Sequence, residues 1–283
     1  MSSEDWTAWI GRTEVVEDDI CLAQALAAAA TLEPLSSPTA SAALPPLWHW
    51  FYFLPRAPQS KLGIDGHPQR GGFIPPIPYP RRMFAGARIR FHHPLLIGQP
   101  ARREGIIRNI TQKSGRTGPL AFVTVGYQIF QNEMLCIEEE QDIVYREPGA
   151  PVPAPVPVEL PPVSDAITRT VTPDTRLLFR FSALTFNAHR IHYDRPYAQQ
   201  EEGYPGLVVH GPLVAVLLME LARHNTTRPI TGFSFRSQAP IFDLAPFRLV
   251  ARFGEDRVEL EAQGPDGATA LSASAELGSD QPL

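Results

Sequence analysis

Titratable and polar side chains concentrate in two neighbouring stretches of the second half of the chain. These stretches are FSALTFNAHRIHYDRPYA, residues 181–198, and EGYPGLVVHGPL, residues 202–213. An imidazole titrates near neutral pH, so His192 is a candidate both to take a proton and to give one back. Asn187 lies five residues before it and offers an amide that can donate and accept hydrogen bonds. The pattern predicts a site for general acid–base chemistry.

Gly211 stands where a helix is predicted to begin. The helix, residues 212–224, is apolar on almost every side, so we expect it to be buried. The first N–H groups of a helix lack intrahelical partners and lie at the positive end of its dipole. Glycine also lets a ligand approach the backbone closely. We therefore expect the N–H of Gly211 to stabilise a negatively charged oxygen.

Other interpretations of these residues are less well supported. His189, His192 and His210 could bind zinc, but no acidic or thiolate fourth ligand stands at a suitable spacing, so we predict no metal. His192 could instead be an ordinary surface histidine. For His210 we favour a structural role, as a packed histidine hydrogen-bonded to the backbone, over a catalytic role. Ser182 lacks the G-x-S-x-G context of a nucleophile and would need a base facing it.

The composition limits the class of protein. The 283 residues suffice for two domains, and 43% hydrophobic residues can form proper cores. A net charge of −5 makes nucleic-acid binding improbable. Neither an apolar run long enough for a membrane span nor a signal peptide is evident. The two cysteines exclude a disulfide framework, so we expect a cytoplasmic protein without nucleic-acid or membrane partners.

A proline-rich segment divides the chain. Seven prolines fall within residues 148–163, which predicts an extended linker between a domain at 1–147 and a domain at 164–283. A proline-rich docking motif for a partner is the weaker alternative.

Both halves show a helix combined with a strand-rich segment. In the first half we expect a helix over 18–32, a Gly/Pro-rich loop over 61–80 that is either functional or disordered, and strands at 87–92, 103–111, 120–130 and 135–145, with a turn at 115–118. In the second half we expect a strand at 176–181, the helix at 212–224, and strands at 231–236, 247–253, 258–263 and 268–277. This order predicts an α+β protein in which a curved antiparallel sheet wraps a long helix in each half.

The motif resembles that of the MaoC-like hydratase/dehydratase family, N-P-x-H-x-D-x-x-Y-A followed by H-G at a helix start. The matching residues are Ile191-His192-Tyr193-Asp194, Tyr197-Ala198 and Val208-Val209-His210-Gly211. The upstream segments LPPLWHWFYFLP, GGFIPP, GPLAFVTV and DIVYREP resemble the N-terminal half of the subgroup that contains mesaconyl-C4-CoA and itaconyl-CoA hydratases. The resemblance therefore extends over essentially the whole chain.

The resemblance implies a double hot-dog fold and reversible hydration of a 2-enoyl-CoA thioester. The N-terminal repeat would be non-catalytic and shape the acyl and CoA tunnel, and the C-terminal repeat would hold His192 and Gly211. Within the subgroup the substrate would be a branched C5 dicarboxylic acyl-CoA, with mesaconyl-C4-CoA or itaconyl-CoA giving citramalyl-CoA. We expect no cofactor other than the coenzyme A of the substrate, and a homodimer.

One position departs from the family. Asn187 stands where the family's catalytic aspartate is usual, five residues before the histidine. An amide cannot act as a base, but it can orient a water and donate to a hydroxyl. Proton transfer would then fall to His192 alone or with the help of Asp194. For Asp194 we favour capping of the next turn.

A dicarboxylic substrate needs a cation, because burying its free carboxylate unpaired is unfavourable. Arg190 and Arg195 flank His192, and Arg236 lies on a later strand. We predict these arginines, together with His210, as substrate-binding residues. The pairs Arg81-Arg82 and Arg102-Arg103 are interpreted as solvated charges, with CoA phosphates as the alternative ligand.

Two rival functions stay open at this stage. A hot-dog acyl-CoA thioesterase would share the fold and the ligand. A catalytically inactive acyl-CoA-binding or scaffold protein would fit the loss of the acid at position 187.

Overall fold

Ten strands form one antiparallel sheet in the computed structural model, which describes residues 5–115 and 118–279. The strand order is β1-β3-β4-β5-β2-β7-β10-β9-β8-β6. The first half contributes β1 (Thr13–Asp19), β2 (Arg81–Phe91), β3 (Pro100–Gly115), β4 (Gly118–Gln131) and β5 (Met134–Arg146). The second half contributes β6 (Ile167–Val171), β7 (Ile230–Ser237), β8 (Phe247–Phe253), β9 (Arg257–Gln263) and β10 (Thr269–Leu277). The two halves therefore have the same internal order and meet at β2 and β7.

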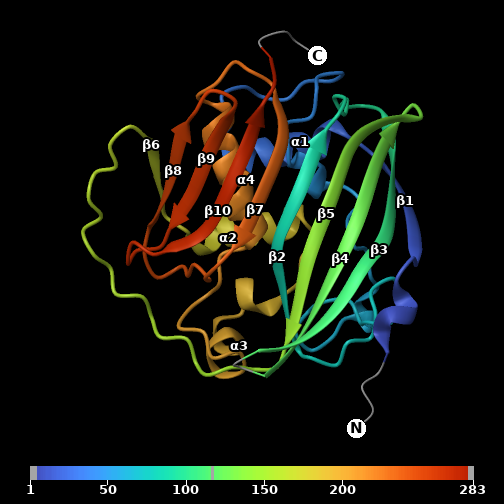
Figure 1. The fold of residues 1–283 in the computed structure, drawn as a ribbon, viewed down its shortest axis with the longest axis vertical. Coiled ribbons are helices and arrows are strands. Elements are labelled where there is room, and N and C mark those ends of the chain that lie inside the picture. The colour runs from blue at the N-terminus through green and yellow to red at the C-terminus, as the bar shows by residue number, and fades with distance from the viewer. Residues whose placement is uncertain (1–4, 116–117, 280–283) are drawn as a thin grey trace.

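The helices lie on one side of this sheet (Figure 1). They are α1 (Leu22–Leu32), α2 (Thr175–Leu184), α3 (Arg195–Gln200) and α4 (Gly211–Arg223), with 3-10 turns η1 (Trp6–Trp9), η2 (Trp48–Phe51), η3 (Gln59–Lys61) and η4 (Arg190–His192). In each half an edge strand leads into a helix, β1 into α1 and β6 into α2. The C-terminal half has in addition the long helix α4.

Helix α4 forms the centre of the C-terminal core. Its residues Leu213–Ala222 are all buried, as the predicted apolar pattern requires. They include Glu220, whose carboxylate accepts a hydrogen bond from the Trp48 indole at 2.9 Å and pairs with Arg223 at 2.8 Å. Because Trp48 belongs to the N-terminal half, this buried contact links the two halves.

Most predicted elements are confirmed. Eight predicted strands correspond to β2–β5 and β7–β10, and the predicted helix at 212–224 corresponds to α4. The predicted turn at 115–118 includes residues 116–117, which lie outside the described part of the chain.

The strand predicted at 176–181 is wrong, because these residues belong to helix α2. Asp174 caps this helix by accepting a hydrogen bond from the Leu177 N–H at 2.9 Å. Leu178, Phe181 and Ser182 are buried at helical spacing. The capping residue and this spacing outweigh the short apolar run that suggested a strand.

The N-terminal helix begins later than predicted. Residues 13–19 form β1, which pairs antiparallel with β3 from Thr13↔Ile106 to Asp19↔Pro100. Helix α1 starts only at Leu22 and buries Ala25, Ala28 and Leu32. The corresponding edge strand of the second half, β6, also had no sequence prediction.

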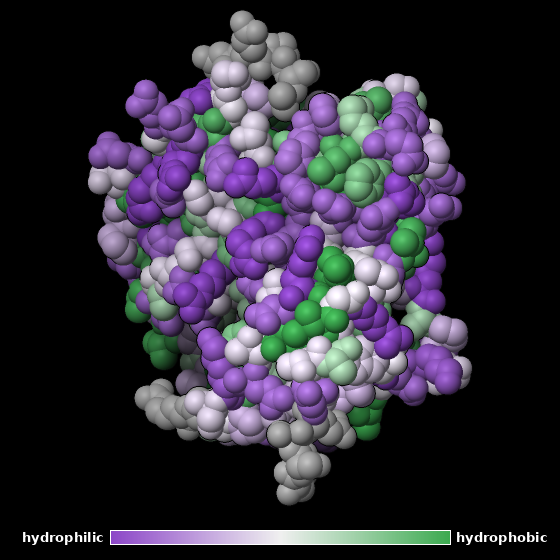
Figure 2. Space-filling model, turned by 45° about the vertical axis from the view of Figure 1, so that its right-hand side comes forward, coloured by the Kyte–Doolittle hydropathy of each residue, from purple (hydrophilic) through white to green (hydrophobic). Residues whose placement is uncertain are grey.

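The segment between β5 and β6 is irregular and runs around the outside of the C-terminal half (Figure 1). It is tied there by backbone hydrogen bonds from Val152 to Gly203 and from Val158 to Pro265, each 2.9 Å long. Hydrophilic side chains dominate the face shown in Figure 2, with small separate hydrophobic patches. Among the described residues, none of the helices has the length and apolar character that a membrane span requires.

Candidate active site

A cavity of about 930 Å³ lies between the two halves. The segment between α1 and β2 contains only the short turns η2 and η3, so no long helix covers the inner face of β4 and β5 as α4 covers the strands of the C-terminal half. Tyr127 and Glu139, on that inner face, line the cavity together with His192 and Gly211. The difference between the halves thus leaves space for a ligand beside the predicted motif.

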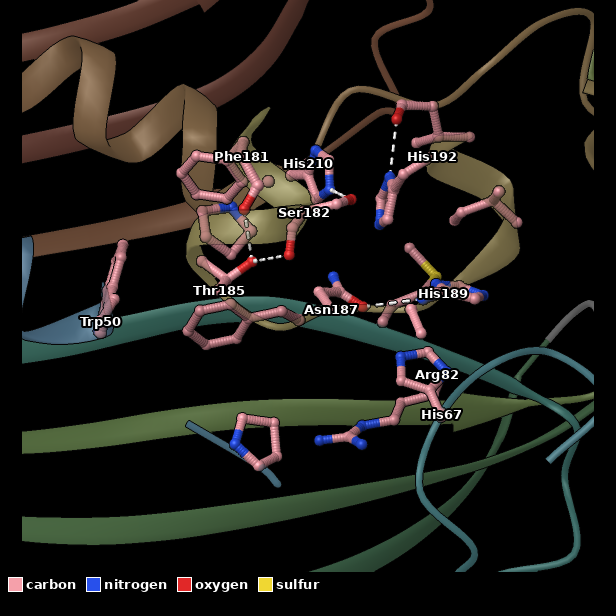
Figure 3. A pocket seen from close by; sticks show the side chains of 18 of the residues that line it. Trp50, His67, Arg82, Phe181, Ser182, Thr185, Asn187, His189, His192 and His210 are labelled. Carbon is pink, nitrogen blue, oxygen red and sulfur yellow. Dashed lines mark hydrogen bonds between the residues drawn. The ribbon is translucent and has the colours of Figure 1, made fainter. Parts of the chain in front are cut away.

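His192 is fixed as a neutral base facing this cavity. Its side chain is buried, and its Nδ1 lies 2.7 Å from the carbonyl oxygen of Val208 (Figure 3). A carbonyl only accepts, so Nδ1 carries the proton and Nε2 is left as the acceptor. Burial lowers the pKa of His192 to about 4, against the opposing effect of this hydrogen bond. At neutral pH the imidazole is uncharged and can take a proton.

Asn187 directs its amide nitrogen to the cavity. Its Oδ1 accepts a hydrogen bond from the His189 backbone N–H at 3.0 Å (Figure 3). With the oxygen engaged, the NH₂ group is the part of the side chain left for a ligand. Asn187 is therefore placed as a hydrogen-bond donor to an oxygen.

Gly211 and His210 stand at the start of α4. His210 is the N-cap residue, Gly211 is the first helical residue, and both line the cavity. The nearest atom to a side chain added at Gly211 would be Ser237 Oγ at 3.5 Å, so the space above this backbone is open. A ligand oxygen can reach the helix N-terminus.

His210 stacks face to face on His192, with ring centroids 3.6 Å apart. Its Nε2 lies 2.9 Å from Ser182 Oγ, so a base does face this serine. His210 Nδ1, however, is buried without a hydrogen-bond partner in the described chain. The third group that orients the histidine of a Ser-His-Asp triad is thus missing here.

The Gly/Pro-rich loop of the N-terminal half packs directly on the motif. The Arg190 N–H donates to the Asp65 carbonyl at 2.9 Å. Gly66 has a φ of +90°, and a Cβ on it would lie 1.8 Å from the Ala188 carbonyl oxygen. Only glycine therefore allows this contact, and Gly66 and His67 of the loop line the cavity.

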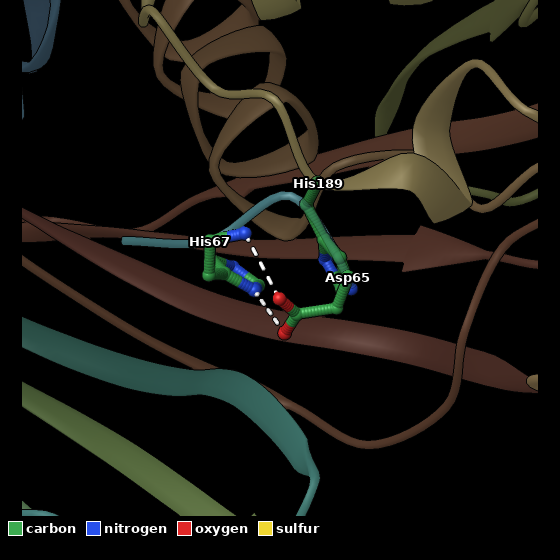
Figure 4. A group of neighbouring side chains, drawn as sticks. All are labelled: Asp65, His67 and His189. Atoms are coloured by element: carbon green, nitrogen blue, oxygen red, sulfur yellow. Dashed lines mark hydrogen bonds and ion pairs between the residues drawn. The ribbon is translucent and has the colours of Figure 1, made fainter. Parts of the chain in front are cut away.

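This loop brings Asp65 and His67 to His189 (Figure 4). Asp65 Oδ2 lies 3.0 Å from His67 Nδ1, and the rings of His67 and His189 are 4.0 Å apart. Burial lowers the pKa of both histidines, and the positive charge of Arg82 lowers them further. Burial opposes ionisation of Asp65, but the bonds from His67 outweigh it and keep its pKa low.

Asp65, His67 and His189 have ligand atoms within 4.8 Å of one another and could in principle hold a metal ion. The zinc site considered from the sequence consisted of His189, His192 and His210. Only His189 belongs to both groups. The nearby charge of Arg82 would repel a cation. Asp65 and His67 were missed by sequence reasoning, because more than a hundred residues separate them from His192.

The three arginines predicted to bind the substrate do not line the cavity. Arg190 pairs with Asp194 at 2.7 Å, and Arg195 pairs with Asp243. Arg236 is exposed on the other side of β7 from the inward-facing Phe235. This placement argues against the prediction that they bind substrate.

Asp194 has the role that the sequence favoured. Its carboxylate caps α3 by accepting a hydrogen bond from the Tyr197 N–H at 3.2 Å. It does not line the cavity, so it is not placed to assist His192.

Other arginines occupy the cavity instead. Arg81, Arg82 and Arg103 line it, although the sequence suggested solvated charges. Arg81 is buried and its Nε lies 3.2 Å from Glu202. Arg103 Nη2 lies 3.2 Å from Glu14.

A family model described as hydroxyacyl-thioester dehydratase type 2 matches residues 47–243, and the chain belongs to this family. The mesaconyl-C(4)-CoA hydratase of Chloroflexus aurantiacus is 88% identical to it over 279 residues, which cover 98% of this chain and 100% of the relative. The MaoC-like resemblance inferred from the sequence is thereby confirmed.

Solved structures share the fold. A MaoC-like dehydratase covers 95% of this chain and 98% of its own, with a TM-score of 0.72 at 13% identity. A Mycobacterium tuberculosis protein described as having a double hotdog fold covers 95% of this chain and 96% of its own, with a TM-score of 0.60 at 12% identity. The predicted α+β double hot-dog fold is confirmed.

Gly66→Ala should separate the loop from the motif. The new Cβ cannot fit against Ala188, so we expect 2-enoyl-CoA hydration to fall roughly 10²-fold through misplacement of the site. Gly98→Ala is the matched control, because its φ is +92° and nothing lies within 4 Å of its Cβ position. Both variants should lose stability by roughly 1–3 kcal/mol from backbone strain. Parent-like hydration by Gly66→Ala would show that the contact is dispensable.

The acid limb of the pH–rate profile should lie at a pH far below the ordinary pKa of an imidazole, about 6.5. His192 keeps its neutral form until the pH falls towards about 4, so kcat/KM should hold down to that region. The unfolded chain protonates its histidines below about pH 6.5, whereas folded His192 stays neutral. The free energy of unfolding therefore falls as the pH drops from about 6.5 towards about 4. Initial rates should therefore be measured where circular dichroism shows the folded state. An acid limb at pH 6.5 or above would contradict a neutral His192 base.

Proposed function

We propose that the protein catalyses the reversible hydration of mesaconyl-C4-CoA to citramalyl-CoA. The observation that carries this proposal is the 88% identity to a mesaconyl-C(4)-CoA hydratase over 98% of this chain and 100% of the relative. The site supports it through a neutral imidazole and a helix N-terminus that face one cavity. Hydration of itaconyl-CoA is the second candidate that the sequence resemblance suggested.

In the proposed reaction His192 Nε2 takes a proton from water while the water oxygen bonds to the β-carbon of the enoyl thioester. The electron pair of the double bond moves towards the thioester oxygen and gives an enolate. The protonated His192 then returns its proton to the α-carbon. One group can serve as base and acid in turn, because Val208 holds Nδ1 protonated throughout.

The enolate oxygen needs donors, and the site offers two kinds. The Gly211 N–H lies at the N-terminus of α4, and the Asn187 NH₂ group faces the same cavity. We assign stabilisation of the enolate to Gly211 and orientation of water or thioester to Asn187. In this mechanism the missing carboxylate at position 187 is not required as a base.

The remaining predictions belong to the same proposal. The N-terminal half (1–147) would form the acyl and CoA tunnel, which agrees with the cavity lining by β2, β4 and β5, and the C-terminal half (164–283) would supply His192. Coenzyme A would enter only as part of the substrate. The homodimer and the cytoplasmic location stay predictions.

His192→Ala should lower kcat for mesaconyl-C4-CoA by at least ~10²-fold, because the general acid–base group is lost. The exposed His93 serves as the matched control, and His93→Ala should behave like the parent protein. Circular dichroism should show the same fold in both variants. Near-normal turnover in folded His192→Ala would exclude this residue as the base.

Asn187→Ala should reduce kcat roughly 10²-fold, because the amide that orients the water or the thioester is lost. Asn187→Asp should retain part of the activity, because a carboxylate can still accept from the His189 N–H and family members usually have an acid there. Steady-state rates of the three proteins decide this. If Asn187→Ala hydrates the substrate as fast as the parent, the residue takes no part.

A further inference from the structure

The proposed substrate places a negative charge beside the reacting carbon. In mesaconyl-C4-CoA the thioester is formed by C4, and the free carboxylate is bonded directly to the carbon that water attacks. A cation that recognises this carboxylate has to lie close to the group that activates water. A cation near the CoA end of the cavity could not reach it. This inference rests on the proposed function and concerns which residue selects that substrate.

Two of the three cavity arginines already have acidic partners. Arg81 is paired with Glu202 and Arg103 with Glu14, each at 3.2 Å. Arg82 forms neither a hydrogen bond nor an ion pair with any residue in the ranges 5–115 and 118–279. A half-buried guanidinium without a partner is unfavourable in the free protein, and an anionic ligand would relieve this cost.

Arg82 also lies at the reacting end of the cavity. In the view of Figure 3 its side chain extends from β2 beside His67, and its guanidinium lies on the other side of Asn187 from His192. Its charge acts on His67 and His189, where it adds to the effect of burial in lowering the pKa. The His189 ring contacts the His192 ring edge to face, with centroids 5.3 Å apart.

We propose that Arg82 binds the free carboxylate of the acyl group and is the specificity-determining residue of the site. A guanidinium can grip a carboxylate through two parallel N–H bonds, which a lysine cannot match. This grip would hold the attacked carbon between Arg82 and His192. A monocarboxylic enoyl-CoA would leave the guanidinium desolvated and unpaired, so the site would disfavour it.

The test compares kcat/KM for mesaconyl-C4-CoA and crotonyl-CoA, which lacks the carboxylate. Arg82→Gln should lower the value for mesaconyl-C4-CoA roughly 30- to 1,000-fold, the scale for truncating one partner of a buried charge pair. The value for crotonyl-CoA should stay the same or rise, because the neutral glutamine removes the desolvated charge that disfavours this substrate. Arg82→Lys should fall between the parent and Arg82→Gln.

Arg90 provides the matched control, because it is exposed on the outer face of the same strand. Arg90→Gln should keep both kcat/KM values of the parent. The melting temperature of Arg82→Gln should not drop, because Arg82 has no partner to lose in the described chain. Should Arg82→Gln nevertheless fail to fold, Arg82→Lys decides the test.

The possible outcomes separate this inference from the proposed function. If the parent hydrates neither substrate, the hydratase proposal itself fails. If the parent prefers mesaconyl-C4-CoA and Arg82→Gln keeps that preference, another group binds the carboxylate and the assignment is overturned. An equal fall for both substrates also overturns it, because Arg82 would then act on something that the two substrates share.

Discussion

The antiparallel pairing of β2 with β7 is the contact on which the site depends. Five residue pairs, from Gly86↔Arg236 to Arg90↔Gly232, join two five-stranded halves into one sheet. Gly86 makes this possible, since a Cβ there would lie 2.4 Å from the Phe235 carbonyl oxygen. Four residues before Gly86, the same strand carries Arg82 to the cavity wall. The pairing thereby sets the position of the N-terminal wall relative to His192.

The cavity follows from the inequality of the two halves. Both have an edge strand, a helix and four further antiparallel strands, but only the C-terminal half has the buried helix α4. Its N-terminus delivers Gly211 and His210 to the cavity, while Tyr127 and Glu139 on the strands of the N-terminal half line the opposite wall. The loop containing Gly66 completes the enclosure from the N-terminal side. One half thus provides most of the groups proposed to be catalytic, and the other provides space and charge.

Sequence patterns were sufficient where local physics decides the structure. Strands such as β7 alternate buried Phe233 and Phe235 with exposed Ser234 and Arg236, and glycine-containing turns separate the later strands. Helix α4 was evident from its unbroken apolar run. Helix α2 was missed because the exposed Phe179 obscures its helical spacing. Edge strand β1 was missed because acidic residues occupy both its exposed and its half-buried positions, so it lacks the usual alternation of apolar and polar residues.

The motif itself identified His192, Asn187 and Gly211, and the structure brings all three to one cavity. Residues contributed by the N-terminal half could not be found in this way. Asp65, His67 and Arg82 reach the site only through the pairing of the halves and the docking of a long loop, and no local pattern encodes either. Sequence proximity to His192 was misleading for Arg190 and Arg195, since nearby carboxylates already neutralise both.

The proposed reaction adds water to the double bond of an enoyl thioester and leaves the thioester bond intact. The most direct test is incubation with mesaconyl-C4-CoA in ¹⁸O-labelled water, followed by mass spectrometry of the acyl-CoA and assay of free thiol. The proposed hydration gives citramalyl-CoA with ¹⁸O in its hydroxyl group and no release of coenzyme A. Free coenzyme A with ¹⁸O in a new carboxylate, or unchanged substrate, would contradict it.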